Sequence, residues 1–103
     1  MTKLRCISGM NKGDEFELHE GYNTVGRAPD CDVRLFDKRV SRQHCRILKR
    51  SKLCSLEDMN SRHGTILNGK DLTKRKVIGE GDKLIVGHTV LLLTEKPTGS
   101  ALE

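Results

Sequence analysis

The sequence is poor in aromatic residues and has no tryptophan. Only Phe16, Tyr22 and Phe36 are aromatic among its 103 residues. Proteins that bind single-stranded nucleic acids stack bases on such side chains, each stack contributing about 1–3 kcal/mol, so this class is disfavoured. The longest unbroken apolar run covers residues 90–93, far short of the length that spans a membrane. No basic segment followed by an apolar stretch opens the chain, so we expect no secretory signal.

The chain also lacks the close cysteine and histidine spacing of a metal site. Its four cysteines form no CxxC pair, and the adjacent His44 and Cys45 would point to opposite faces of a strand. Each cysteine lies in or near an apolar run. An even count would allow three disulfide pairings, but we predict buried, reduced thiols in a cytoplasmic protein. We expect neither a metal nor a cofactor. The cysteines are Cys6, Cys31, Cys45 and Cys54.

Catalytic signatures are missing as well. The sequence has no GxSxG elbow and no SxxK motif, and a pairing of Ser41 with His44 would still need an orienting carboxylate and an oxyanion hole. We therefore predict that the protein is not an enzyme. Its 19 Lys and Arg residues exceed 14 Asp and Glu residues, for a net charge of +5. This balance favours an anionic partner, which could be nucleic acid, phosphate or an acidic protein.

Apolar residues alternate with polar ones over many short segments, and no window of twelve residues shows a helical stripe. Asn68-Gly69 is the strongest short hairpin signal in the chain. Many short strands with glycine-rich turns between them predict an all-β sandwich or barrel. We expect one domain over residues 1–96 and a flexible tail over 97–103 whose last two residues resemble a vector-derived scar. The predicted strands are 4–7, 16–19, 22–26, 32–35, 44–49, 53–58, 65–67, 76–78, 82–86 and 89–94.

Three polar segments fall in predicted loops: Gly26-Arg27, residues 39–44 and residues 60–65. Alternate loops of a sandwich gather at one end, so these segments could converge. Together they contain several guanidinium groups, two hydroxyls and two imidazoles, which is a donor set suited to a phosphate group. The alternative is that they form an ordinary solvated loop surface, and composition alone does not decide between the two.

Four motifs occur in order along the chain. They are Gly26-Arg27, Val40-Ser-Arg-Gln-His44, the stretch 58–69 that contains Arg62-His-Gly-Thr65, and the stretch 78–87 with its Gly-Asp and Val-Gly pairs. At this spacing the chain resembles the forkhead-associated (FHA) domain family from about residue 4 to residue 94. The resemblance implies a sandwich of about eleven strands in two twisted, mostly antiparallel sheets, with the ligand loops at one end. It also implies phosphothreonine binding without catalysis, often as one domain of a larger regulator.

The resemblance assigns roles to individual residues. Arg27 takes the position of the phosphate-binding arginine, and Ser41 that of the serine whose hydroxyl contacts the phosphate. Arg42 lies where the family often has a basic or polar residue facing the peptide or phosphate, and Arg62 at a variable position that commonly adds a phosphate donor. The residues expected to support the loops are His44, through hydrogen bonds, and Gly26, Gly64, Asn68 and Gly69, as turn residues.

One position departs from the family pattern. The family usually has an asparagine before Gly-Thr, where its amide contacts the peptide backbone, whereas this chain has His63. An imidazole has its donor and acceptor on opposite edges, so His63 either makes one hydrogen bond or adds a cationic donor near the phosphate. On the neighbouring loop we expect Arg39, together with Lys38, to contact acidic residues C-terminal to the phosphothreonine.

These observations favour a phosphothreonine-dependent protein-binding module that acts in signalling. Its partner would be a threonine-phosphorylated protein, with no membrane involved, in the cytoplasm or, in a eukaryote, the nucleus. Two alternatives remain open. The first is a phosphate-independent scaffold or self-association domain, whose arginines would contact acidic partners. The second, less favoured because aromatic residues are scarce, is a nucleic-acid binder.

Overall fold

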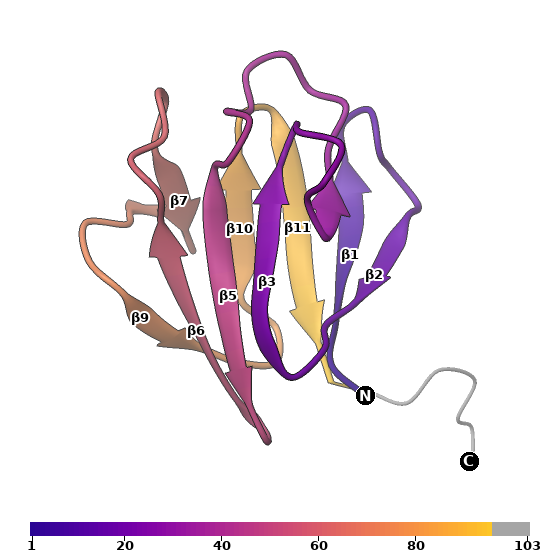
Figure 1. Ribbon diagram of the computed structural model, residues 1–103, viewed down its shortest axis with the longest axis vertical. Helices are drawn as coiled ribbons and strands as arrows, with labels where there is room; N and C mark the ends of the chain where they lie inside the picture. The colour runs from indigo at the N-terminus through magenta and orange to yellow at the C-terminus, as the bar shows by residue number, and fades with distance from the viewer. Residues whose placement is uncertain (96–103) are drawn as a thin grey trace.

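The computed structural model describes residues 1–95, which form eleven strands and no helix. The strands build two facing sheets (Figure 1), so the all-β sandwich predicted from the sequence is confirmed. The expected domain boundary at residue 96 and the tail 97–103 lie outside the described residues. The strands are β1 Lys3–Ser8, β2 Glu15–Glu17, β3 Gly21–Gly26, β4 Val33–Arg34, β5 Cys45–Arg50, β6 Leu53–Asp58, β7 Thr65–Leu67, β8 Lys70–Asp71, β9 Lys76–Ile78, β10 Lys83–Val86 and β11 Thr89–Thr94.

The two sheets are antiparallel throughout, apart from one pair of strands. The first has six strands in the order β2-β1-β11-β10-β7-β8, and the second has five in the order β4-β3-β5-β6-β9. Only β3 and β4 run parallel, with Val25 opposite Val33. Because side chains alternate between the faces of a strand, every second residue points into the space between the sheets.

The core lies between the two inner faces. Leu4 of β1, Ile47 of β5, Leu56 of β6 and Leu91 of β11 are fully buried there. Each leucine or isoleucine buried in this way stabilises the fold by about 1.5–3 kcal/mol relative to an exposed side chain. The packed core fixes the strands, and the strands fix where the loops at each end begin and finish.

All four cysteines are buried and free. Burial disfavours the charged thiolate and raises the pKa of the Cys45 thiol to about 12. The Cys31 thiol donates a hydrogen bond to the carbonyl oxygen of Arg42, with 3.2 Å between sulfur and oxygen. The cysteines therefore act as small buried side chains in the described part of the chain.

The observed strands follow the predicted ones closely, with differences at the ends. Asn68-Gly69 forms the expected two-residue turn, with φ of 50° at Asn68 and 84° at Gly69. Strand β8 was not predicted, because two charged residues carry no alternating pattern and become a strand only by pairing with β7. The predicted strand 32–35 is shorter, Val33–Arg34, and His44 precedes β5 rather than beginning it.

The turns and loops fall at two opposite ends of the sandwich (Figure 1). The upper end carries the long segment between β4 and β5, the β6–β7 loop, the β10–β11 turn and the β1–β2 loop. The lower end carries the β5–β6 and β9–β10 turns. Within the described residues there is no helix long and apolar enough to cross a membrane.

Candidate functional site

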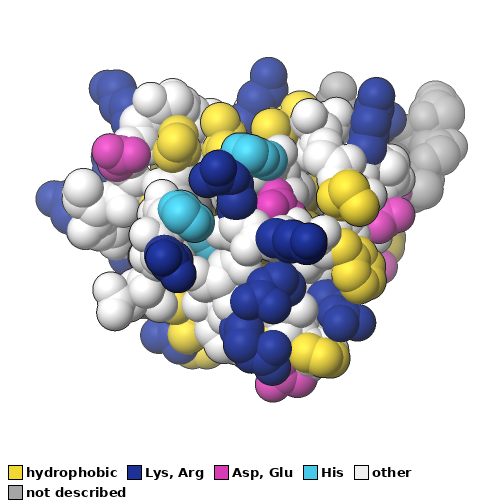
Figure 2. All heavy atoms as spheres, turned by 90° about the horizontal axis from the view of Figure 1, so that it is seen from above, with side chains coloured by type: hydrophobic (Ala, Val, Ile, Leu, Met, Phe, Trp, Pro, Cys, Tyr) yellow, Lys and Arg dark blue, Asp and Glu magenta, His cyan; other side chains and the backbone are white. Residues whose placement is uncertain are grey.

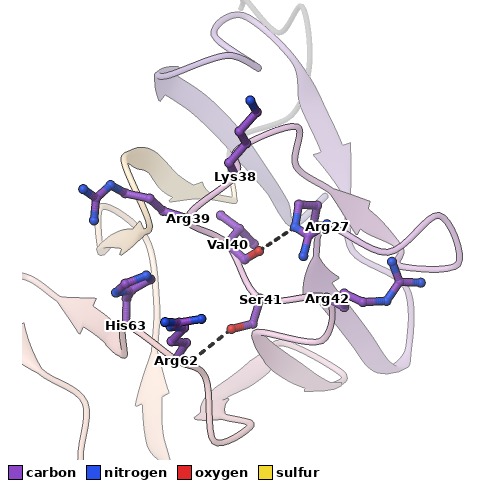
Figure 3. Close-up of a pocket in the computed structure, with 8 residues that line it drawn as sticks. All are labelled: Arg27, Lys38, Arg39, Val40, Ser41, Arg42, Arg62 and His63. Carbon is purple, nitrogen blue, oxygen red and sulfur yellow. Dashed lines mark hydrogen bonds between the residues drawn. The ribbon is translucent and has the colours of Figure 1, made fainter.

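A pocket of about 340 Å³ opens at the upper end of the sandwich (Figure 3). We call it the arginine pocket. Three chain segments meet in it: the residue after β3, the segment before β5 and the β6–β7 loop. The three polar segments found in the sequence therefore do converge, and none of the residues lining the pocket is acidic. Those residues are Arg27, Lys38, Arg39, Val40, Ser41, Arg42, Arg62 and His63.

Arg27 is held against the neighbouring segment by its side chain and its backbone. Its Nε donates to the carbonyl oxygen of Val40 at 3.0 Å, and its backbone N–H donates to the carbonyl oxygen of Ser41 at 3.1 Å. A guanidinium group has five N–H donors. Since only the Nε–H is used within the described structure, the four terminal N–H groups remain available in a fixed position at the pocket.

Gly26 allows this close approach. A Cβ atom at this position would lie 2.1 Å from the carbonyl oxygen of Arg42, which itself accepts a hydrogen bond from the backbone N–H of Ala28 at 3.1 Å. The family resemblance assigned Gly26 to a turn. The structure instead places it at the end of β3, where the requirement is space for a neighbouring backbone rather than an unusual φ angle.

The Ser41 hydroxyl is positioned by the β6–β7 loop. Its Oγ accepts a hydrogen bond from the backbone N–H of Arg62 at 3.0 Å. Because a hydroxyl has one proton to donate, this contact occupies an oxygen lone pair and leaves the O–H available to a ligand. Figure 3 shows the Ser41 hydroxyl, the Arg27 guanidinium and the Arg62 guanidinium arranged around the middle of the pocket.

His44 ties the same two loops together from beneath the pocket. Its imidazole is fully buried. Nδ1 accepts from the backbone N–H of Ser41 at 3.0 Å, so Nε2 carries the proton and donates to the carbonyl oxygen of Gly64 at 2.8 Å. Gly64 adopts a φ of 80°, a region that favours glycine. The imidazole therefore supports the loops and does not face the ligand space.

The β6–β7 loop is organised by Asp58. Its carboxylate accepts from the backbone N–H of Ser61 at 3.0 Å, from the Ser61 hydroxyl at 2.6 Å and from the Thr65 hydroxyl at 2.6 Å. Burial acts to raise the pKa of Asp58, but these hydrogen bonds outweigh it, so the pKa lies below its ordinary value. An ionised Asp58 thus fixes the loop that carries Arg62 and His63.

Asp37 organises the segment before β5 in the same way that Asp58 organises the β6–β7 loop. Its carboxylate accepts from the backbone N–H of Arg39 at 2.9 Å, from that of His88 at 2.8 Å and from the Thr89 hydroxyl at 2.9 Å. Burial acts to raise the pKa of Asp37, but these hydrogen bonds hold it below its ordinary value. Sequence reasoning missed Asp37, because two of its three partners, His88 and Thr89, lie about fifty residues away. The one available signal was an acidic residue beside the Val40-Ser41 motif.

Apart from the buried Val40, the remaining side chains of the pocket are exposed cations and an exposed imidazole. No carboxylate within the described residues forms an ion pair with Arg39, Arg42, Arg62 or His63. Arg39 and Arg42 extend in opposite directions from Ser41, while His63 lies beside Arg62 (Figure 3). Seen from above, dark blue Lys and Arg side chains gather over this end of the molecule (Figure 2). The surface can therefore receive an anion without displacing a carboxylate of its own.

Residues 5–97 match a family model described as the inner membrane component of T3SS, cytoplasmic domain. The FHA domain-containing protein FhaA of Mycobacterium tuberculosis is 33% identical over 81 residues, which is 79% of this chain and 15% of FhaA. The oxoglutarate dehydrogenase inhibitor of Corynebacterium diphtheriae is 32% identical over 89 residues, covering 86% of this chain and 62% of that protein. The chain thus spans less than two thirds of these relatives.

Solved structures of FHA domains have the same fold as this chain. A domain studied for phosphothreonine-dependent FHA domain interactions superposes with a TM-score of 0.86 at 31% identity, covering 93% of this chain and 97% of that one. The FhaA FHA domain, complexed with an intracellular domain of another protein, superposes with a TM-score of 0.84 at 31% identity, covering 90% and 99%. The sequence motifs, the eleven-stranded sandwich and these relatives agree: the chain belongs to the FHA domain family.

Proposed function

We propose that this FHA domain binds threonine-phosphorylated segments of partner proteins in the arginine pocket. One observation carries the proposal. Arg27 and Ser41 are fixed by the fold, yet within residues 1–95 four guanidinium N–H groups and one hydroxyl proton remain unused, in a pocket with no acidic lining residue. A phosphate group has three strong acceptor oxygens and a charge of about −1.5 to −2 at neutral pH, which matches this donor set.

Binding would proceed through charge-assisted hydrogen bonds. The Arg27 fork pairs with two phosphate oxygens, and the Ser41 hydroxyl donates to the phosphate. Each hydrogen bond to a charged group contributes about 1.5–3 kcal/mol in proteins. Arg62 approaches from the β6–β7 loop and adds a further cation. Because Asp58 and His44 hold this loop in place before the ligand arrives, little ordering is left to oppose binding.

The pocket residues next to Arg27 and Ser41 would contact the polypeptide around the phosphothreonine. His63 lies beside Arg62, where it can donate one hydrogen bond to the peptide or the phosphate. Arg39 and Lys38 line the same pocket from the segment before β5 and would favour acidic residues C-terminal to the phosphothreonine. Recognition of phosphorylated motifs by arginine clusters is a common mode of peptide binding.

The module would act by binding alone, without catalysis, as part of a regulatory protein in the cytoplasm. Two observations support this: relatives that carry the same domain include an enzyme inhibitor and an FHA domain-containing protein, and the matched family model describes a cytoplasmic domain.

The experiment measures binding by calorimetry with a degenerate phosphothreonine peptide library and with the same library in unphosphorylated form. We expect binding of the phosphorylated library only, and loss of that binding in Arg27→Ala and Ser41→Ala. Arg50→Ala is the matched control, since Arg50 is an exposed arginine in the β5–β6 hairpin at the other end. Equal binding of both libraries would instead identify a phosphate-independent scaffold.

A second measurement separates the nucleic-acid alternative. Filter binding to duplex and single-stranded DNA across a salt series reports how many phosphates the protein neutralises. We expect weak binding that disappears at physiological salt, while phosphothreonine peptides remain bound. Nucleic-acid binding that survives physiological salt and competes with the phosphopeptide would contradict the proposal.

A further inference from the structure

A second hollow lies next to the arginine pocket. It has a volume of about 360 Å³ and is formed by the β1–β2 loop, the segment after β4 and the β10–β11 turn. We call it the Met10–Phe36 groove. In contrast to the arginine pocket, it is lined by two large hydrophobic side chains. The residues lining it are Gly9, Met10, Phe36, Asp37, Lys38 and His88.

The two hydrophobic side chains of the groove are unusually open to solvent. Met10 is 78% exposed and Phe36 is 56% exposed. They come from segments 26 residues apart in the sequence, so local chain geometry does not explain why they meet at one hollow. Scattered exposed hydrophobic residues are ordinary, but neighbouring ones that share a groove indicate an interaction site.

The groove is preformed and does not depend on a loose loop. The backbone N–H of Phe36 donates to the Asn11 side-chain oxygen at 2.9 Å, and Asn11 itself is buried. The Arg34 guanidinium lies 4.8 Å from the centre of the Phe36 ring, which restrains the ring. On the other side, Asp37 accepts from the backbone N–H of His88. A site held in this way loses little conformational freedom on binding.

The groove continues directly from the arginine pocket. Lys38 lines both hollows, and the backbone N–H of Arg39 is bonded to Asp37, which lines the groove. Ser41 and Phe36 are five residues apart along this segment. The segment between them turns, because the backbone N–H of Val40 donates to the carbonyl oxygen of Asp37 at 3.0 Å, so Phe36 and Ser41 lie closer than five extended residues. An extended ligand chain advances about 3.3–3.6 Å per residue and therefore needs no more than about five residues to reach the groove from a phosphate bound at Ser41.

We propose that the Met10–Phe36 groove binds a large apolar side chain, such as leucine, isoleucine, methionine or phenylalanine, of the same phosphorylated ligand. That side chain lies within about five residues of the phosphothreonine, in the direction of Lys38 and Arg39. This inference rests on the proposed function, because the phosphate anchors the ligand at the neighbouring pocket. The preferred partner is therefore a segment that combines phosphothreonine, negative charge and one bulky hydrophobic residue.

The test uses phosphothreonine peptides of fifteen residues in an alanine and glutamine background. A single leucine is moved through positions one to seven on each side of the phosphothreonine, and affinity is measured by fluorescence anisotropy. Half-burying a leucine side chain in this open groove is favourable enough to tighten binding about three- to twelvefold. We expect this gain at one or two adjacent positions on one side only.

Three variants locate the effect. We expect Met10→Gln and Phe36→Gln each to reduce the affinity for the best leucine peptide to that of the leucine-free peptide. Both should leave the affinity for the leucine-free phosphopeptide unchanged. Leu53→Gln is the matched control, because Leu53 is 59% exposed and lies at the β5–β6 turn at the other end of the sandwich. We expect it to have no effect on either peptide.

The outcomes separate this inference from the proposed function. Phosphate-dependent binding with equal affinity for every leucine position would overturn the groove proposal and leave the phosphothreonine site intact. Loss of the leucine-free phosphopeptide in Met10→Gln and Phe36→Gln would also overturn it, because these residues would then support the arginine pocket. A dimer that Met10→Gln dissociates would assign the groove to a second copy of the chain and overturn it. Binding that ignores phosphorylation would overturn both proposals.

Discussion

Both ends of the sandwich carry charged side chains, but the two ends use them differently. At the lower end a cation and a carboxylate lie together: Lys49 Nζ lies 3.5 Å from Glu20 and donates to the carbonyl oxygen of Ser51 at 2.8 Å, while Glu20 accepts from the backbone N–H of Ser51 at 2.9 Å. At the upper end no ion pair within the described residues involves the cations of the arginine pocket.

The difference lies in what the carboxylates bind. The upper end also has two well-placed carboxylates, Asp37 and Asp58, but both accept from backbone N–H groups and hydroxyls inside the loops. They fix the loops and leave the arginines without an internal counterion. A surface ion pair contributes only about 0–1 kcal/mol, so the fold loses little by leaving these cations free. The upper end is thus rigid and still able to bind an anion.

The largest effect should come from replacing Arg27, which lies in the arginine pocket at the upper end. We expect Arg27→Ala to lower affinity for a phosphothreonine peptide by roughly 2–5 kcal/mol, because a desolvated phosphate loses its bidentate partner. Calorimetry measures the affinity, and thermal unfolding should show an intact fold. Arg50→Ala, at the lower end, should bind as tightly as the parent protein. Unchanged affinity in Arg27→Ala would mean that the phosphate binds elsewhere.

Glycines at the two ends should respond differently to substitution. In Gly26→Ala the new Cβ would lie 2.1 Å from the carbonyl oxygen of Arg42, so the backbone must shift, at a cost of about 1–3 kcal/mol in the free energy of unfolding. Gly79, in the β9–β10 turn, has no atom within 4 Å of an added Cβ. We expect Gly79→Ala to change stability by less than about 1 kcal/mol. Urea titration of both variants measures the contrast, and equal losses would refute it.

Acid should weaken the upper end through its two carboxylates. The pKa values of Asp37 and Asp58 are lowered in the folded protein, so their ionised forms stabilise it above the ordinary aspartate pKa of about 3.9. This stability is lost as the pH falls from there through the lowered values.

Stability measured by urea titration between about pH 5 and pH 2 checks this expectation. We expect Asp37→Asn and Asp58→Asn each to lose about 1–3 kcal/mol at pH 7 and to show a shallower decline in acid. Asp71→Asn, at an exposed position of β8, serves as the control and should retain the parent slope. A parent-like slope in the Asp37 and Asp58 variants as well would contradict the assignment.

A smaller effect is expected at His63. An asparagine amide presents a donor and an acceptor side by side and can pair with both groups of a peptide unit, whereas an imidazole cannot. We expect His63→Asn to tighten phosphopeptide binding by about 0.5–1.5 kcal/mol, measured by calorimetry at about pH 8. Weaker binding would instead show that His63 already makes a productive contact with the ligand.

The smallest effect concerns peptide sequence. Lys38 and Arg39 are exposed, so an acidic residue C-terminal to the phosphothreonine should gain less than about 1 kcal/mol from them. The gain should shrink between 50 mM and 500 mM salt, since exposed charges are screened. Affinities of Glu and Gln peptide pairs at both salt concentrations measure it. A neutral preference at every such position at low salt would exclude these contacts.

Most of the strand pattern could be predicted from the sequence. Residues 53–58, 65–67, 76–78 and 89–94 are strands as predicted, because alternating apolar residues between glycine-rich turns leave few other ways to bury a face. Strand β8 could not be predicted, since its existence depends on pairing with β7. The ends of β4 and β5 were also set by pairing partners and not by their own residues.

The candidate site was predicted in part. Its ligand-facing members, Arg27 and Ser41 among them, were assigned from motifs and lie together in the arginine pocket, although their contact with phosphothreonine stays a prediction. Asp37 and Asn11 were missed, because each acts on atoms distant in the sequence. The cytoplasmic location also stays a prediction.

The sequence by itself determined the class of fold, the hairpin at Asn68-Gly69 and the set of side chains that can donate hydrogen bonds to a phosphate. These depend on local alternation, turn chemistry and residue type. Only the tertiary structure decided which donors remain free. Arg27 uses one N–H to hold Val40, and Ser41 accepts from the backbone of Arg62 and keeps its proton. It also placed Met10 beside Phe36 at a shared groove. Hydrogen-bond partners and neighbouring surfaces come from chain segments brought together by folding, and that information is absent from any one stretch of sequence.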